Sequence, residues 1–133
     1  MDDVLPEGYL DPYDAAAVAA LVDRAQAVAG RDGVLDLLAR LPGAVADPGR
    51  PGRLLRGATP ATLRLGAEWV VVVAEPPVLE HVVAGVVLQR EPLAAGRAAR
   101  LLAPVVADLA RDLGNRLDTA LVLTAYAETL ERG

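Results

Sequence analysis

Five residue types are missing from this chain of 133 residues: Cys, Phe, Lys, Ser and Ile. Without cysteine the chain has no disulfide, thiol nucleophile, Cys-ligated zinc or iron–sulfur cluster. Without serine and lysine it has no Ser-His-Asp triad, phosphate-loop lysine or Schiff base. A single histidine, His81, cannot supply a multi-histidine metal site, and no acidic loop of the calcium-binding type is present. The sequence therefore predicts neither a metal nor a cofactor.

Aromatic residues are few, although 53% of the residues are hydrophobic. The aromatic residues are Tyr9, Tyr13, Trp69 and Tyr126. The core must therefore be built from Ala, Val and Leu. Every positive charge is an arginine. Because the codons of Lys, Ile and Phe are AT-rich, we interpret these absences as the signature of a GC-rich bacterial genome.

The net charge of −5 and the pI near 4.8 disfavour nucleic acid and anionic membranes as partners. No apolar run approaches the roughly 18 residues of a membrane span. The acidic start at Asp2 and Asp3 is unlike a signal peptide, so we expect a cytoplasmic protein. All charged residues before Arg24 are acidic, whereas all charged residues between positions 48 and 67 are arginines. These two segments could attract each other within or between chains.

Apolar residues at helical spacing predict two helices near the N-terminus. The first follows an N-cap at Asp11 and ends at Gly30, and the second runs from about Asp32 to Leu41. A Pro/Gly/Arg-rich loop then covers about 42–60, with four prolines and four glycines in nineteen residues. This composition is incompatible with a regular element over most of the loop.

Valine-rich segments after the loop predict a three-stranded antiparallel meander over Thr62–Leu65, Trp69–Ala74 and Val78–Gln89. Since both faces of these strands are largely apolar, we expect the sheet to be covered on both faces. One or two C-terminal helices complete a single α+β domain over residues 1–133.

The first C-terminal helix begins near Pro92 or a turn later and ends at Gly114. The segment after Asn115 fits a second helix whose inward residues are Leu117, Leu121, Thr124 and Leu130. Residues 120–128 can also be interpreted as a strand.

A small sheet that is apolar on both faces is hard to cover with the helices of one chain. We therefore expect a homodimer, with the sheet or the last helices at a self-complementary interface. The alternative is a monomer in which two pairs of helices sandwich the sheet.

His81 is the sharpest candidate for chemistry, because a carboxylate from Glu68, Glu75 or Asp118 could orient its ring. The neighbouring Glu80 lies on the opposite face of the strand and cannot pair with it. No nucleophile stands at a recognisable spacing, so we do not expect an enzyme.

Small side chains can leave room for a ligand between sheet and helices, with Trp69, His81 and Tyr126 as polar handles. In the Pro/Gly loop, Arg50, Arg53 and Arg56 recur at every third residue. They could dock on an acidic partner through charge-assisted hydrogen bonds, or they could simply keep a linker soluble.

These features favour a non-enzymatic interaction module: an adaptor, regulator or chaperone-like binder that pairs with itself and with another protein. The alternative is a small ligand-binding protein or enzyme with its site near His81. In size, acidity and helix–strand–helix order the chain is similar to small dimeric secretion chaperones, an analogy of composition and element order rather than of motif.

Overall fold

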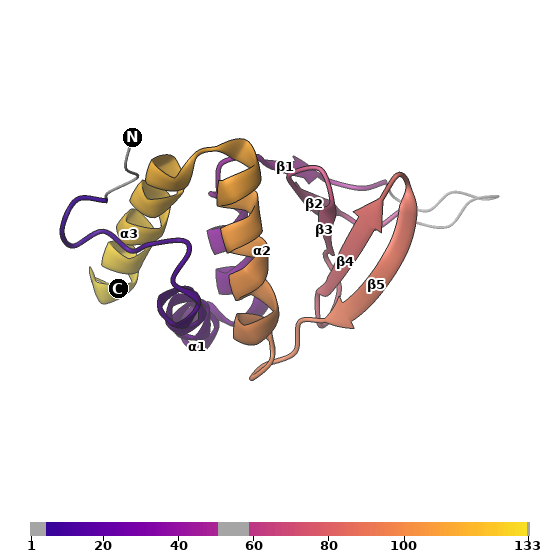
Figure 1. The fold of residues 1–133 in the computed structure, drawn as a ribbon. Helices are drawn as coiled ribbons and strands as arrows, with labels where there is room; N and C mark the ends of the chain where they lie inside the picture. The colour runs from indigo at the N-terminus through magenta and orange to yellow at the C-terminus, as the bar shows by residue number, and fades with distance from the viewer. Residues whose placement is uncertain (1–4, 51–58, 133) are drawn as a thin grey trace.

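The computed structural model describes residues 5–50 and 59–132. These residues form three helices and a five-stranded antiparallel sheet, so the predicted α+β class is confirmed (Figure 1). In chain order the elements are α1 (Ala15–Ala39), β1 (Ala44–Asp47), β2 (Thr62–Leu65), β3 (Trp69–Val72), β4 (Val78–Val83), β5 (Val86–Pro92), α2 (Ala98–Leu113) and α3 (Arg116–Arg132). The strands follow one another across the sheet in the order β1-β2-β3-β4-β5.

Helix α1 stands where two N-terminal helices were predicted. It is a single interrupted element, because Ala29 and Gly30 depart from helical geometry inside it. Gly30 has a φ of 61°, a left-handed conformation that costs glycine little free energy. The break in α1 therefore falls at the residue where the first helix was predicted to end. The predicted N-cap at Asp11 is wrong. Asp14 caps the helix, and its carboxylate accepts a hydrogen bond from the Ala17 backbone N–H at 3.2 Å.

Strand β1 lies within residues 42–60, which were predicted to form a loop over most of their length. Its four residues carry neither proline nor glycine, and they pair antiparallel with β2. A further bridge joins Arg50 to Thr59, with both backbone hydrogen bonds at 2.9 Å. The pairing partner of β1 is distant in sequence, which is why local composition did not reveal the strand.

Strands β4 and β5 replace the single long strand predicted over Val78–Gln89. Between them Ala84 and Gly85 make a two-residue turn with φ of 51° and 79°, the backbone signs of a type I′ turn. The pairing then shifts after His81, which leaves Leu88 as an extra residue in β5, a β-bulge. The predicted three-stranded meander is therefore wrong, and the sheet has five strands.

The three helices lie on one face of the sheet, with α2 next to the strands and with α1 and α3 beyond it (Figure 1). The buried strand residues Leu63, Leu65, Val71 and Leu79 share the inner face of the sheet, the face that α2 covers. The prediction that both faces are covered is not met by the helices of this chain. On the helix-free face Val72 and Val78 stand opposite each other and Val70 stands opposite Glu80. These three valines are half-buried, although no described segment forms a layer over them.

Helix α3 includes residues 120–128, so the helical interpretation of that segment is confirmed. Its predicted inward face is correct only in part. Thr124 and Leu130 are half-buried, but Leu117 and Leu121 are exposed while Ala120 and Leu123 are buried. Small residues on the inner face let α3 lie close to α1.

The segment before α1 is fastened to the two C-terminal helices. The Asp11 carboxylate accepts hydrogen bonds from Nε and Nη2 of Arg116 at 3.1 and 2.6 Å. The Tyr13 ring stacks against the guanidinium groups of Arg111 and Arg116, at 5.4 and 4.7 Å from the ring centre. Asp11 of the acidic N-terminal segment thus pairs with α3. Asp2, Asp3, Arg53 and Arg56 lie outside the described residues, so the attraction between this segment and residues 48–67 stays a prediction.

Asp11→Asn tests this attachment through its pH dependence. Hydrogen bonds from Arg116 hold the pKa of the Asp11 carboxyl below its ordinary value. The pair therefore stabilises the fold above the pKa of an unfolded aspartate, near 3.9, and this stabilisation is lost as the pH falls through the lower folded pKa. We expect the variant to lose about 1 kcal/mol at neutral pH in urea unfolding, since the pair is partly exposed.

The loss caused by Asp11→Asn should shrink at about pH 2, where the carboxylate is protonated in both states. Asp14→Asn is the control, because asparagine caps a helix as well as aspartate does. An equal loss at both pH values would contradict the assigned role of the ion pair.

Ala84→Asn tests the strained turn of the β4–β5 hairpin. Asparagine tolerates a left-handed backbone better than alanine, so we expect the free energy of unfolding to rise by about 1 kcal/mol. Gly85→Ala should lower it by about the same amount. Apart from Gly85 itself and its two chain neighbours, no heavy atom of the described residues lies within 4 Å of a Cβ placed at Gly85, so the loss reports backbone conformation alone. Unchanged urea midpoints in both variants would contradict the left-handed backbone conformation of Ala84 and Gly85.

Candidate functional site

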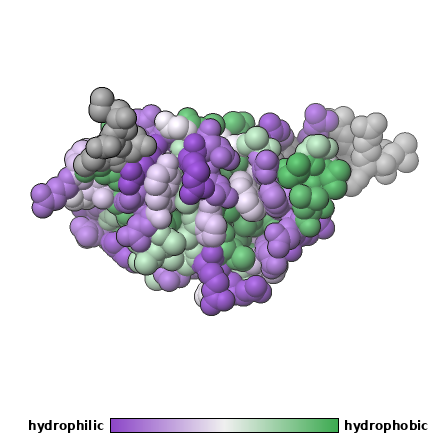
Figure 2. All heavy atoms as spheres, in the orientation of Figure 1, coloured by the Kyte–Doolittle hydropathy of each residue, from purple (hydrophilic) through white to green (hydrophobic). Residues whose placement is uncertain are grey.

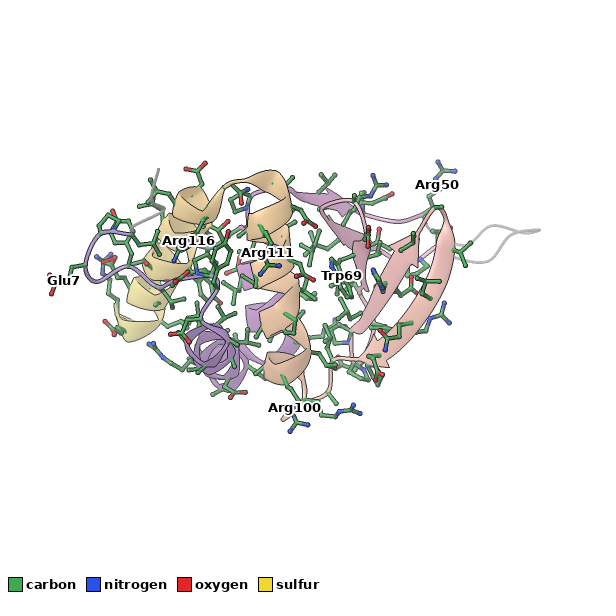
Figure 3. The ribbon with its side chains drawn as sticks, viewed as in Figure 1. Glu7, Arg50, Trp69, Arg100, Arg111 and Arg116 are labelled. Atoms are coloured by element: carbon green, nitrogen blue, oxygen red, sulfur yellow. The ribbon has the colours of Figure 1, made fainter. Side chains whose placement is uncertain are left out.

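A groove runs between the inner face of the sheet and the first half of α2, with a cavity volume of about 200 Å³. Trp69 lies in it between α2 and the sheet, and Arg100 lies near the start of α2 (Figure 3). Strand register explains the sheet side of the groove, because Trp69, His81 and Gln89 stand opposite one another on three adjacent strands. The remaining lining residues are Leu79, Glu91, Leu101, Pro104 and Val105.

Trp69 and His81 form a stacked pair at the edge of this groove. Their ring centres are 4.3 Å apart and the ring planes meet at 21°. Nε2 of His81 lies 2.8 Å from Oε1 of Glu68. Since a carboxylate only accepts, Nε2–H is the donor, and Nδ1 is left for other contacts. The arrangement fixes the orientation of the imidazole ring.

Of the three carboxylates proposed to orient His81, the structure selects Glu68. Glu75 instead lies 3.3 Å from Nε of Arg31. Asp118 stands in the first turn of α3. Glu80 is on the helix-free face, where it accepts a hydrogen bond from Nε of Arg90 at 2.9 Å. It therefore points away from His81, as strand alternation requires.

Tyr126 was expected to share a pocket with Trp69 and His81, and the structure does not bring it to the groove. Its ring is buried between helices, where its hydroxyl donates to the Gly33 carbonyl at 3.0 Å. The Arg40 guanidinium lies 5.2 Å from the ring centre. Burial raises the pKa of the Tyr126 hydroxyl. Tyr126 is thus a core residue of the helical layer.

The predicted docking segment is only partly described. Arg50 is exposed, and its backbone is paired with Thr59 (Figure 3). Arg53 and Arg56 lie outside the described residues. Docking of a partner through these three arginines stays a prediction.

An apolar surface at the end of the β4–β5 hairpin was missed by the sequence analysis. Four adjacent aliphatic residues are between 36 and 58% exposed there: Val83, Val86, Val87 and Leu88. We call these four residues the hairpin tip, and Figure 2 shows apolar surface gathered over this hairpin. A hollow of about 330 Å³ adjoins it, lined by residues 87–90. Gly85 inside the valine run was the one signal of a turn.

The described residues contain no group of three or more His, Cys, Asp or Glu side chains that could hold a metal ion. No helix in the described part of the chain is both long enough and apolar enough to cross a membrane.

The groove offers an oriented imidazole, an indole face and a guanidinium above an apolar floor.

Tyr126→Phe tests the structural role of Tyr126. The variant removes the donor to the Gly33 carbonyl, so we expect a loss of about 1 kcal/mol in urea unfolding. The fluorescence of Trp69 should not change, because Tyr126 does not line the groove. A changed emission with unchanged stability would place Tyr126 in the groove after all.

The chain was compared with known proteins. Residues 10–131 match the family described as a domain of unknown function, DUF5073. No curated protein and no solved structure matches the chain. The matched segment covers every helix and strand apart from the last residue of α3. The chain therefore belongs to the DUF5073 family.

Proposed function

We propose that the protein is a non-enzymatic interaction module that forms a homodimer through the hairpin tip. The observation that carries the proposal is the exposure of four neighbouring aliphatic side chains at the end of one hairpin. Burying apolar surface is worth about 25 cal/mol per Å². Contiguous apolar patches on a soluble protein mark sites of association more often than scattered apolar residues do.

A second copy of the chain suits this surface. In a two-fold contact the same patch lies on both sides, so apolar side chains meet apolar side chains. The nearest charged pair, Glu80 and Arg90, is joined at 2.9 Å and adds no net charge to the contact. The shallow hollow beside Leu88 is open to solvent and lies next to this contact.

The helix-free face of the sheet carries further valines. Val45 is 59% exposed on the edge strand β1, and Val70, Val72 and Val78 are half-buried, with Arg64, Glu80 and Arg90 in the same cross-strand row as Val45 and Val70. A dimer centred on the hairpin tip would draw part of this face into its interface. Contact over more than the hairpin tip is needed, because stable interfaces bury about 800 Å² on each partner.

Light scattering at micromolar concentration tests the homodimer. We expect a mass of twice the 13.8 kDa of the chain. The double variant Val86→Thr/Leu88→Thr keeps side chains that favour strands but removes apolar area. It should weaken the dimer by about tenfold or more and shift the mass toward the monomer.

Val28→Thr is the matched control, because Val28 is 63% exposed on α1 and stands apart from the hairpin tip. This variant should dimerise like the parent chain. A monomeric parent chain would refute the homodimer. If the double variant still dimerised like the parent chain, the hairpin tip would not be the interface. The interface would then lie elsewhere, for example at the exposed Leu117 and Leu121 of α3.

A further inference from the structure

The groove beside α2 has the size of a small ring-containing ligand. Its cavity volume is about 200 Å³. A cavity of about 150 Å³ is enough to hold benzene in another protein, so this one has room for a ring with a short substituent. Its floor is apolar, because Leu79 and Val105 are both at most 5% exposed. An apolar body that lies against this floor would contact buried apolar side chains there.

One wall of the groove is aromatic and held in place. The stacked rings of Trp69 and His81 line it, and Glu68 fixes the imidazole through the 2.8 Å hydrogen bond. Aromatic rings prefer offset-stacked or edge-to-face contacts with other rings, which add about 0.5–1.5 kcal/mol beyond area burial. This wall thus favours a planar ring over an aliphatic chain.

The charges at the groove favour an anionic substituent. Glu91 lies 3.7 Å from Nη2 of Arg97, and Glu68 is engaged with His81. Arg100 is exposed near the start of α2, where it borders both this groove and the hollow between α1 and α2, and among the described residues it takes part in no ion pair. Its guanidinium can pair with a carboxylate through two parallel hydrogen bonds.

The geometry points to a binding site for a small aromatic carboxylate. The ring of the ligand lies against Trp69 and His81, and its carboxylate pairs with Arg100. Both walls of this site come from one chain, so the site does not require the homodimer, although Gln89 borders both the groove and the hollow beside the hairpin tip.

Intrinsic fluorescence gives a direct measurement, because Trp69 is the single tryptophan of the chain. We expect 3-phenylpropionate to change the emission of Trp69 in a saturable way. The neutral isostere 3-phenylpropanamide should bind about tenfold more weakly, since it cannot form the charge-assisted pair. The saturated analogue 3-cyclohexylpropionate should also bind severalfold more weakly, because it lacks a ring that stacks.

Arg100→Gln should reduce the affinity for 3-phenylpropionate to that of the amide and leave the affinity for the amide unchanged. Arg24→Gln removes the same charge from an exposed position on α1, and should bind 3-phenylpropionate like the parent chain. If both variants lost the same affinity for 3-phenylpropionate, Arg100 would act only through the net charge of the protein. That result would overturn the proposed pair between Arg100 and the ligand carboxylate.

The three probes on the parent chain test the site even if a variant fails to fold. No saturable response to 3-phenylpropionate would overturn the site itself. Equal affinity for the acid and the amide would overturn the anionic preference, and equal affinity for the two acids would overturn the aromatic one.

Discussion

The packing of α2 on two sides is the constraint on which the rest of the structure depends. Toward α1 it presents the alanines Ala99 and Ala103, which face a further hollow of about 440 Å³. Toward the sheet it presents larger side chains, among them Leu101, Val105 and Leu109. In general, small residues let two helices approach to about 8–10 Å, whereas larger side chains span the wider gap between a helix and a sheet. A chain without Phe or Ile can build such a layered core from Ala, Val and Leu.

Local signals in the sequence predicted the helical part of the fold well. Gly30 breaks α1, Gly114 ends α2 in a left-handed conformation, and the Asn115 carbonyl accepts from the first turn of α3. Each of these features depends on residues within one turn of the helix. The sheet was harder, because β1 exists only through pairing with a distant strand. The β4–β5 turn has Ala84 at a position where asparagine would have been a clear sequence signal of a hairpin turn.

Only part of the candidate groove could be predicted from the sequence, because its two walls come from elements that are far apart in the chain. Trp69 and His81 fall on neighbouring strands joined by a short connection, so the sequence could place them on one sheet face. Arg100 could not be added, because the approach of α2 to that face is a property of the layers. Tyr126 was misplaced because the sequence does not say that α3 lies beyond α2 rather than beside the sheet. The inward face of α3 was predicted for Thr124 and Leu130 but not for Leu117 and Leu121, since apolar side chains stand on both faces of this helix.

The β-bulge at Leu88 has a consequence for how the hairpin meets its surroundings. An edge strand with regular backbone hydrogen-bonding groups can recruit further strands and start aggregation. In β5 the bulge interrupts that regular spacing, Arg90 adds a charge, and Pro92 at its end lacks an N–H. The apolar side chains of this hairpin can therefore be displayed to a partner while its backbone is a poor template for fibre growth.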